Sequence, residues 1–331
     1  MIISKTPYRI SFFGGGSDYP SWYNNQNGEV LSTTIDKYLY INVRNLPPFF
    51  EHKYRVSYSS LETSNNIMGI KHKVVREAIK FFKLNNGLEI NYAGDIPSRS
   101  GMGSSSSFVV GLLNSLNYLK NKKIINKRDL ALDAINFEQN TLKEDVGAQD
   151  QVIATYGGFN SIKFQKNKIF SIQKSNISDD FKNYLNKNLL LMYTGQVRTA
   201  QIIAKSFVNK INSEKKNEIY EILEHVKLAK KIIKNEDILS FGKLLNDSWK
   251  IKKKLSKNIS NSVLDDIYNL AITKGALGGK ILGAGGGGFF LFLVPLEKQK
   301  KFKSIFNKYL FIPFNFSNKG TEIIFDSEKK Y

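Results

Sequence analysis

The chain has 331 residues, of which 41% are hydrophobic and 24% charged, so it can build a sizeable core and does not resemble a disordered protein. Its 49 lysine and arginine residues exceed the 29 aspartate and glutamate residues, and the net charge of +20 suggests a polyanionic partner. The absence of cysteine excludes disulfides, thiolate metal sites and a cysteine nucleophile. The three histidines do not have the spacing of zinc ligands, so we expect no histidine metal site.

The excess charge is carried by lysines, because only seven of the basic residues are arginines. Many lysines fall in runs such as Asn121–Arg128, Lys227–Asn235 and Lys250–Asn258, which are typical of solvated helix faces and contain few aromatic residues. A nucleic-acid surface usually adds arginines and stacking aromatics, so we predict no nucleic-acid partner. The longest apolar run, Phe289–Val294, is far shorter than the roughly 20 residues of a membrane-spanning helix. The N-terminus lacks the build of a signal peptide, and we expect a cytoplasmic protein without a membrane partner.

The first half of the chain begins with β-forming residues and continues with segments of helical periodicity. Strands are expected at Arg9–Phe13, at Tyr54–Tyr58, at Gly87–Tyr92, as a pair of strands within Glu29–Val43, and as a hairpin of Gly157–Phe164 with Ile169–Ile172. Helices are expected at Lys71–Phe82, over most of Gly101–Lys120, and at Asp129–Leu142.

The second half is richer in helices and ends in a strand–loop–strand followed by a short helix and further strands. The expected helices are Ala200–Ile211, Glu218–Ile233, Ile238–Leu255, Val263–Lys274 and Glu297–Asn307. The expected strands are Leu189–Tyr193, Lys280–Leu282, Phe289–Val294, Leu310–Asn315 and Glu322–Phe325. This order predicts an α+β fold with two domains, residues 1–180 and 181–331, and the polar segment Lys174–Lys187 is the expected boundary.

A loop rich in glycine and serine, Pro97–Ser107, lies between a predicted strand and a predicted helix. Glycines allow close backbone approach, and the free N–H groups of a helix N-terminus bind anions. The alternative is a simple serine cap, but one cap needs one serine, whereas four follow one another here. We therefore predict a loop that holds nucleotide phosphates, although it is not a P-loop. Its candidate residues are Ser98, Ser100, Gly101, Met102, Gly103, Ser104, Ser105 and Ser106.

A second glycine run, Gly283–Gly288, matches the letters of a dinucleotide-binding fingerprint. Such a fingerprint must lead into a helix, but a predicted strand follows here, so we reject that interpretation. The run is then either a flexible turn or a backbone wall beside a phosphate. Gly285 and Gly286 are the residues that we expect to lie near a substrate.

Three carboxylates complete the set of candidate residues. Asp18 follows a predicted strand that bears Arg9 and ends in a glycine turn, and it is either a substrate ligand or a turn-capping residue. Glu138 lies on a predicted helix, and Asp150 follows shortly after Gly147, which interrupts the helical pattern. Two carboxylates near a phosphate loop could divide the work, one holding Mg²⁺ and the other orienting an attacking hydroxyl. Either could also be an ordinary surface residue.

Taken together, these motifs resemble the GHMP small-molecule kinases, the family of galactokinase, homoserine kinase and mevalonate kinase. The first motif is Pro7-x-Arg9-x-x-x-x-Gly14-x-x-x-Asp18-Tyr19, the second is Pro97-x-x-x-Gly101-Met102-Gly103-Ser104-Ser105, and the third is the late glycine run. They occur in the order of the family and span nearly the whole chain. The first motif looks like that of the D-glycero-D-manno-heptose 7-phosphate kinases and the related fucokinase-like branch.

The resemblance implies an N-terminal domain like ribosomal protein S5 domain 2 and a ferredoxin-like C-terminal domain. It implies that Asp150 is catalytic with Arg9 beside it, that Ser105 and Glu138 bind Mg²⁺, and that ATP is the phosphoryl donor. Gly15, Gly16, Asp18, Gly285 and Gly286 would bind the sugar together with Arg9 and Asp150. We guess that Arg198 holds the phosphate of the substrate, although a helix-surface arginine is as good an interpretation.

The expected activity is ATP-dependent phosphorylation of the anomeric hydroxyl of D-glycero-D-manno-heptose 7-phosphate. The 1,7-bisphosphate would serve the synthesis of nucleotide-activated heptose for bacterial surface polysaccharide. One alternative is an anomeric kinase for a free sugar such as fucose. Another, from a different class, is a non-catalytic nucleic-acid-binding protein on the same fold. The expected partner is a small sugar phosphate, and the protein is expected to be a monomer or a homodimer.

Overall fold

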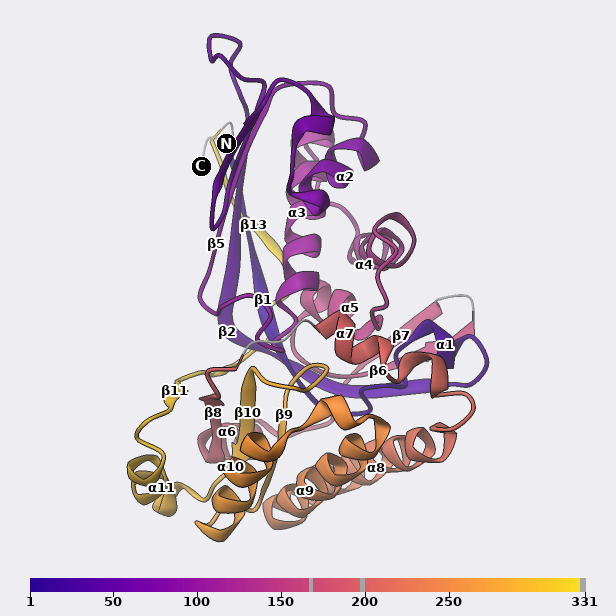
Figure 1. Ribbon diagram of the computed structural model, residues 1–331, viewed down its shortest axis with the longest axis vertical. Coiled ribbons are helices and arrows are strands. Elements are labelled where there is room, and N and C mark those ends of the chain that lie inside the picture. Colours follow the sequence, from indigo (N-terminus) through magenta and orange to yellow (C-terminus); the bar gives the residue numbers. More distant parts are fainter. Residues whose placement is uncertain (167–168, 197–199, 328–331) are drawn as a thin grey trace.

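The computed structural model describes residues 1–166, 169–196 and 200–327. The first half of the described chain is built on a large sheet with the strand order β13-β1-β2-β5-β3-β4, to which β6, β7 and β12 are attached through β2 (Figure 1). Its two longest strands, β1 and β2, pair antiparallel from Ile2 opposite Val43 to Phe13 opposite Leu31. The strands are β1 Ile2–Phe13, β2 Gly28–Asn45, β3 Tyr54–Ser57, β4 Leu61–Ser64, β5 Leu88–Gly94, β6 Phe159–Gln165, β7 Ile169–Lys174, β12 Phe316–Ser317 and β13 Glu322–Asp326.

Helices cover one face of this sheet, and α3 contacts both β1 and β2 (Figure 1). The helix α3 is buried along most of its length, and its apolar side chains join those of the strands in one core. The helices of this half are α1 Pro20–Tyr23, α2 Lys73–Phe81, α3 Ser104–Asn121, α4 Lys127–Asn136 and α5 Gln149–Tyr156.

The second half contains an antiparallel sheet with the order β11-β8-β10-β9, and Figure 1 shows helices α8, α9 and α10 beside it. The strands are β8 Leu189–Tyr193, β9 Gly278–Ile281, β10 Phe289–Leu293 and β11 Leu310–Ile312. The helices are α6 Asp179–Asn188, α7 Ala200–Lys205, α8 Lys216–Lys234, α9 Ile238–Leu255, α10 Ser262–Thr273 and α11 Gln299–Ile305.

The two halves share a hydrophobic core across the second sheet. Side chains alternate between the two faces of a strand. Leu190 and Phe290 face the helices of the second half, whereas Leu191 and Leu291 join the core of the first half. Helix α8 also contacts β1 and β2, so the two halves are packed directly against each other.

The α+β class is confirmed, but several local predictions were wrong. Residues Glu29–Val43 lie in one continuous strand, β2, rather than in two. The segment at the expected boundary contains a helix that was not predicted, α6, which begins at a Ser178 cap that accepts the Phe181 N–H at 3.0 Å. Helix α4 ends at Asn136, and a π-helical turn, Phe137–Thr141, follows it. The strands β12 and β13 return to the first sheet, and a boundary at residue 180 stays a prediction.

Candidate active site

The predicted phosphate loop connects β5 to the N-terminus of α3. Gly103 precedes the helix with a φ of 75°, a left-handed conformation that favours glycine. The Arg99 N–H donates to the Ser104 hydroxyl at 3.3 Å, which closes the loop on itself. Ser98 is exposed, whereas the side chain of Met102 is buried in the core, so only the backbone of Met102 is open to a ligand role. The first N–H groups of α3 have no intrahelical acceptor, as an anion site requires.

Arg9 and Asp150 form a two-pronged ion pair beside this loop. The Nε and Nη2 atoms of Arg9 each donate to a carboxylate oxygen of Asp150 at 2.7 Å. Arg9 Nη1 donates to the Gly101 carbonyl at 2.6 Å, and the Arg9 N–H donates to the Met102 carbonyl at 3.1 Å. A Cβ on Gly103 would lie 3.1 Å from Arg9 Cγ, so glycine lets the loop close over the pair. The structure therefore brings the expected catalytic residues and the phosphate loop together.

Asp18 is almost completely buried behind Gly16 and the start of α5. Its carboxylate accepts the Gly16 N–H at 3.0 Å and the Gln149 N–H at 3.4 Å. Burial and the negative charge of Asp150 raise the pKa of Asp18 to about 6. Gly147 is necessary here, because a Cβ at that position would lie 1.9 Å from Asp18 Oδ2. We expected Gly147 to serve Asp150, but the contact shows that it makes room for Asp18.

Glu138 is fully buried, and hydroxyl and amide donors surround it. It accepts hydrogen bonds from Ser105 at 3.2 Å, from Ser106 at 2.8 Å and from the side-chain amide of Gln151. Burial raises the pKa of Glu138 to about 8, and no basic side chain pairs with it in the described part of the chain. The π-helical turn places Glu138 at this position, and such turns are frequent at functional sites.

The Ser105 hydroxyl and the Glu138 carboxylate are hard oxygen donors of the kind that Mg²⁺ binds. A buried carboxylate without a basic partner would gain from a cation, so the two residues fit the predicted metal site. The described residues contain no cluster of three or more His, Cys, Asp or Glu side chains that could hold a metal. Phosphate oxygens and water would have to supply the remaining ligands.

The late glycine run packs backbone to backbone against the phosphate loop. A Cβ on Gly283 would lie 2.6 Å from Gly101 Cα, and one on Gly288 would lie 2.2 Å from the Ser100 carbonyl oxygen. The Gly286 N–H donates to the Ile259 carbonyl at 2.8 Å, and Gly285 is partly exposed. The run leads into the strand β10 rather than into a helix, as we predicted when we rejected a dinucleotide-binding fingerprint. Two glycine motifs far apart in the sequence thus form one wall.

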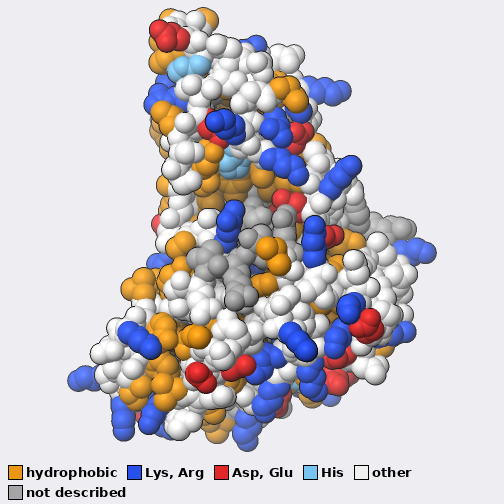
Figure 2. Space-filling model, viewed as in Figure 1, with side chains coloured by type: hydrophobic (Ala, Val, Ile, Leu, Met, Phe, Trp, Pro, Cys, Tyr) orange, Lys and Arg blue, Asp and Glu red, His pale blue; other side chains and the backbone are white. Residues whose placement is uncertain are grey.

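Two groups of residues near these motifs were not predicted from the sequence. Figure 2 shows a hollow at mid-height of the molecule that is lined by hydrophobic side chains and has a histidine beside it. Phe108 lies one helical turn after Ser104, and its ring is 4.7 Å from that of Tyr92 and 5.3 Å from that of His72. The second group is a pair of lysines, Lys252 and Lys280, whose side chains reach the backbone of the glycine run and of β1.

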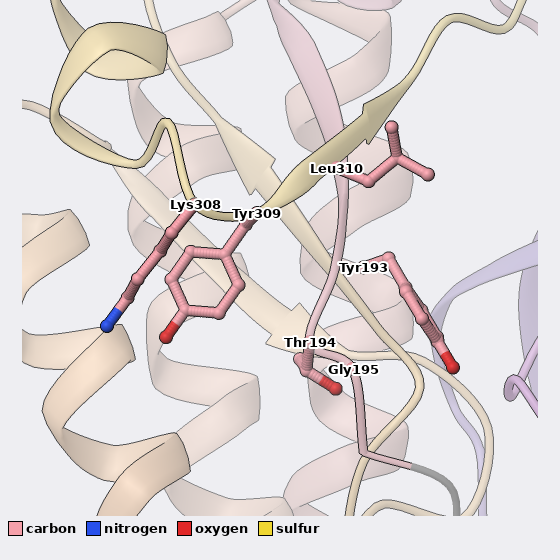
Figure 3. A pocket seen from close by; sticks show the side chains of 6 residues that line it. All are labelled: Tyr193, Thr194, Gly195, Lys308, Tyr309 and Leu310. Carbon is pink, nitrogen blue, oxygen red and sulfur yellow. The ribbon is translucent and has the colours of Figure 1, made fainter.

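A pocket of about 380 Å³ opens on the second sheet (Figure 3). It is lined by Tyr193, Thr194, Gly195, Lys308, Tyr309 and Leu310. Thr194 connects it to the glycine run, because its hydroxyl donates to the Gly288 carbonyl at 2.8 Å. Figure 3 shows Lys308 and Tyr309 projecting side by side from the segment before β11. Arg198, our candidate ligand for the substrate phosphate, lies outside the described residues.

Comparison with known proteins shows the family to which the chain belongs. Models of the N-terminal and C-terminal domains of the GHMP kinases match residues 70–158 and 228–311. A D-glycero-alpha-D-manno-heptose 7-phosphate kinase from Campylobacter jejuni is 30% identical over 97% of this chain and 98% of the relative. A bifunctional fucokinase/GDP-fucose pyrophosphorylase from Arabidopsis thaliana is 24% identical over 90% of this chain and 30% of its own length. The crystal structure of a D-glycero-D-manno-heptose 1-phosphate kinase from Bacteroides thetaiotaomicron has a TM-score of 0.79 at 20% identity, covers both chains completely and shows the same fold.

These matches define an ATP-dependent phosphotransferase with an alcohol group as acceptor. The chain belongs to the GHMP kinase family, and within it the chain is a sugar kinase. No helix in the described ranges is long and apolar enough to cross a membrane.

Proposed function

We propose that the protein phosphorylates the anomeric hydroxyl of D-glycero-D-manno-heptose 7-phosphate to give the 1,7-bisphosphate. The observation that carries the chemistry is the position of Asp150, which Arg9 holds by two 2.7 Å bonds next to the phosphate loop. The choice of sugar is supported by the heptose 7-phosphate kinase that matches 97% of the chain. The product would enter the synthesis of nucleotide-activated heptose for bacterial surface polysaccharide, in the cytoplasm.

Phosphoryl transfer depends mainly on positioning and on neutralisation of charge. Asp150 would accept or orient the proton of the attacking hydroxyl, and the Arg9 guanidinium holds the Asp150 carboxylate in place by two hydrogen bonds. The N–H groups at the start of α3 would bind the phosphates of ATP, with the loop hydroxyls of Ser104 and Ser106 as further donors. Ser105 and Glu138 would hold Mg²⁺, which when bound neutralises charge on the β- and γ-phosphates.

The sugar would lie between the glycine turn after β1 and the glycine run. Gly15 is partly exposed, and a Cβ there would meet Gln149 Nε2 and Ser11 Oγ at 3.8 Å, an ordinary contact distance. Asp18 would bind sugar hydroxyls, and the backbone of Gly16 and Gly285 would border them. The phosphate of the substrate needs a cation, and Arg198 stays our prediction for it.

A cluster of aromatic residues around Phe108 of α3 offers a place for the base of ATP. Tyr58, His72, Tyr92 and Phe108 pack on one another, and three of the four are partly exposed. Aromatic rings form stacking platforms for nucleobases. Since Phe108 is one turn along α3 from the loop, an adenine stacked there would leave its phosphates at Ser104–Ser106. We therefore propose that ATP extends from this aromatic cluster to the N-terminus of α3.

A panel of sugars and sugar phosphates with an ADP-release assay tests the proposal. We expect turnover with the heptose 7-phosphate and little or none with heptose, fucose, galactose or mevalonate. Phosphorus NMR of the product should show a new anomeric phosphate. The similarity to a fucokinase makes fucose the alternative substrate. Turnover with fucose would refute the proposed sugar but not the proposed phosphorylation of an anomeric hydroxyl. No ADP release with any sugar, together with salt-dependent oligonucleotide binding, would overturn the kinase assignment in favour of a non-catalytic protein.

A further inference from the structure

The side chain of Lys252, on α9, reaches the backbone of the glycine run. Its Nζ donates to the Ile281 carbonyl at 3.0 Å and to the Gly283 carbonyl at 2.5 Å. Its neighbours on the same helix behave differently, since Lys253 pairs with Asp265 and Lys254 is exposed. Of these three adjacent lysines, Lys252 is therefore the one whose side chain binds the backbone of the candidate active site.

The positive charge of Lys252 is not offset by a nearby acid. No carboxylate in the described ranges forms an ion pair with Lys252 or with Lys280, whose Nζ donates to the Phe12 carbonyl at 2.7 Å. Burial, and then the positive charges of Lys280 and Arg9, hold the pKa of Lys252 well below its ordinary value of 10.5. An anionic ligand at the glycine run would compensate this concentration of positive charge.

The bond to the Gly283 carbonyl also fixes the direction of the next N–H group. In a trans peptide the C=O and the following N–H point in opposite directions, and the described chain contains no cis peptide. When the Gly283 carbonyl faces Lys252, the Ala284 N–H faces away from it. The residues Gly283, Ala284 and Gly285 are partly exposed, and the Ala284 N–H donates to no acceptor in the part of the chain that the structure describes.

The peptide that carries this free N–H group lies beside the predicted phosphate loop. Gly283 touches Gly101 of the phosphate loop, and Arg9 holds the Gly101 carbonyl while it pairs with Asp150. The peptide that joins Gly283 to Ala284 is therefore close both to the phosphates of ATP and to the residue that would receive the sugar hydroxyl. Backbone N–H groups fixed in advance stabilise the charge that develops in a transition state.

We propose that Lys252 is a positioning residue that fixes the Gly283–Ala284 peptide so that its N–H binds the terminal phosphate of ATP. The proposal rests on the proposed function, because it assumes that ATP binds at the phosphate loop. Lys252 acts through the backbone and does not touch the phosphate itself. The positive φ values of Gly283 and Gly285, 69° and 108°, leave this segment without the restraint that side chains would give, so an external anchor is needed.

The first test compares Lys252→Met, which keeps an unbranched side chain one atom shorter and removes its donors and charge, with Lys254→Met on the exposed face of the same helix. For Lys252→Met we expect kcat to fall at least tenfold and the affinity for AMP-PNP to fall by a similar factor. The affinity for ADP, which lacks the terminal phosphate, should change less than twofold. Lys252→Arg, which keeps the charge and the donors, should recover part of the activity. Lys254→Met should match the wild type.

Three outcomes would overturn the proposal. Kinetics of Lys252→Met within twofold of Lys254→Met would show that the lysine has no part in the reaction. An equal loss of affinity for ADP and AMP-PNP would indicate a general distortion of the loop. A third measurement replaces Ala284 by lactic acid, which removes the N–H group and also weakens the Gly283 carbonyl as an acceptor for Lys252, and which does not depend on the folding of Lys252→Met. Wild-type turnover in that protein would also refute the role of the N–H.

The measurements of AMP-PNP and ADP binding distinguish a failure of this proposal from a failure of the proposed function. A wild-type protein that binds AMP-PNP but releases no ADP with any sugar would refute the substrate, and the comparison of AMP-PNP with ADP would still test Lys252. A wild-type enzyme that turns over, with Lys252→Met unaffected, would refute only the role of Lys252.

Discussion

Asp18 offers a test in which stability and activity should change in opposite directions. The side chain is 2% exposed, and no basic side chain in the described chain forms an ion pair with it. Its folded pKa of about 6 lies above the ordinary value of 3.8, because burial penalises the charged form. Since the folded protein binds this proton more tightly than the unfolded chain does, the ionised carboxylate destabilises the fold at neutral pH.

The sign and the size of the effect follow from the two pKa values. Below pH 3.8 the group is protonated in both states and costs nothing. As the pH rises from 3.8 to about 6 only the unfolded chain loses its proton, so stability falls by about 3 kcal/mol and then stays level. Asparagine cannot ionise, so Asp18→Asn removes this dependence. Its amide can accept only one of the two N–H bonds well, which costs about 1 kcal/mol at every pH.

We therefore expect Asp18→Asn to be about 1 kcal/mol less stable than the wild type near pH 4 and about 2 kcal/mol more stable near pH 7.5. Urea unfolding of both proteins across this range measures the difference, and Asp266→Asn at an exposed position is the control. The same variant should use the sugar poorly, because the carboxylate is the expected hydroxyl ligand. A stability difference that does not change with pH would refute the argument that Asp18 is a buried charge.

Three further changes test other parts of the site. Asp150→Asn should abolish turnover while ATP still binds in a calorimeter, and near-normal turnover would remove Asp150 from the mechanism. Ser105→Ala should raise the Mg²⁺ concentration needed for half-maximal rate, whereas an unchanged Mg²⁺ titration would argue against its ligand role. Gly147→Ala should lower the free energy of unfolding by about 1–3 kcal/mol, because the new Cβ would collide with Asp18. The double variant with Asp18→Gly should recover most of that loss, and no recovery would place the strain elsewhere.

Helical periodicity predicted the elements that carry the site well. Helix α9 was expected at Ile238–Leu255 and has those bounds, with an Asp237 cap that accepts the Ser240 N–H at 3.0 Å. The phosphate loop was recognisable because its glycines and serines serve the backbone locally. Such features depend on residues that are neighbours in the sequence, and these are what a single sequence specifies best.

The features that were missed depend on contacts between distant segments. The need for glycine at position 147 comes from Asp18, which lies far away in the sequence. We predicted two strands where the structure has one, β2. The strand stays continuous because it pairs with β1 along most of its length, with two shifts of register. No helix was predicted within the polar segment Lys174–Lys187, but Phe181 and Leu185 anchor α6 in the core. No local pattern shows which partner will cover a segment.

One missed residue did leave a signal in the sequence. Lys252 follows Leu245 and Ser248 and precedes Leu255 on the stripe of α9 that faces the protein. Residues at this spacing lie on one side of a helix, so a lysine there is not on the solvated face. The three adjacent lysines are alike in composition. Only their positions around the helix distinguish Lys252, which faces the protein, from Lys253 and Lys254.

The position of that lysine changes the meaning of the +20 charge. A net charge describes the whole surface, whereas a ligand responds to the charges near its own site. Arg9, Lys252 and Lys280 are gathered around the glycine motifs, against Asp150 and an Asp18 whose pKa is raised. This gathering of basic groups suits a site that receives ATP together with the sugar phosphate that we propose as substrate. The remaining lysines would then attract these anions only at long range, an effect that salt should weaken without changing kcat.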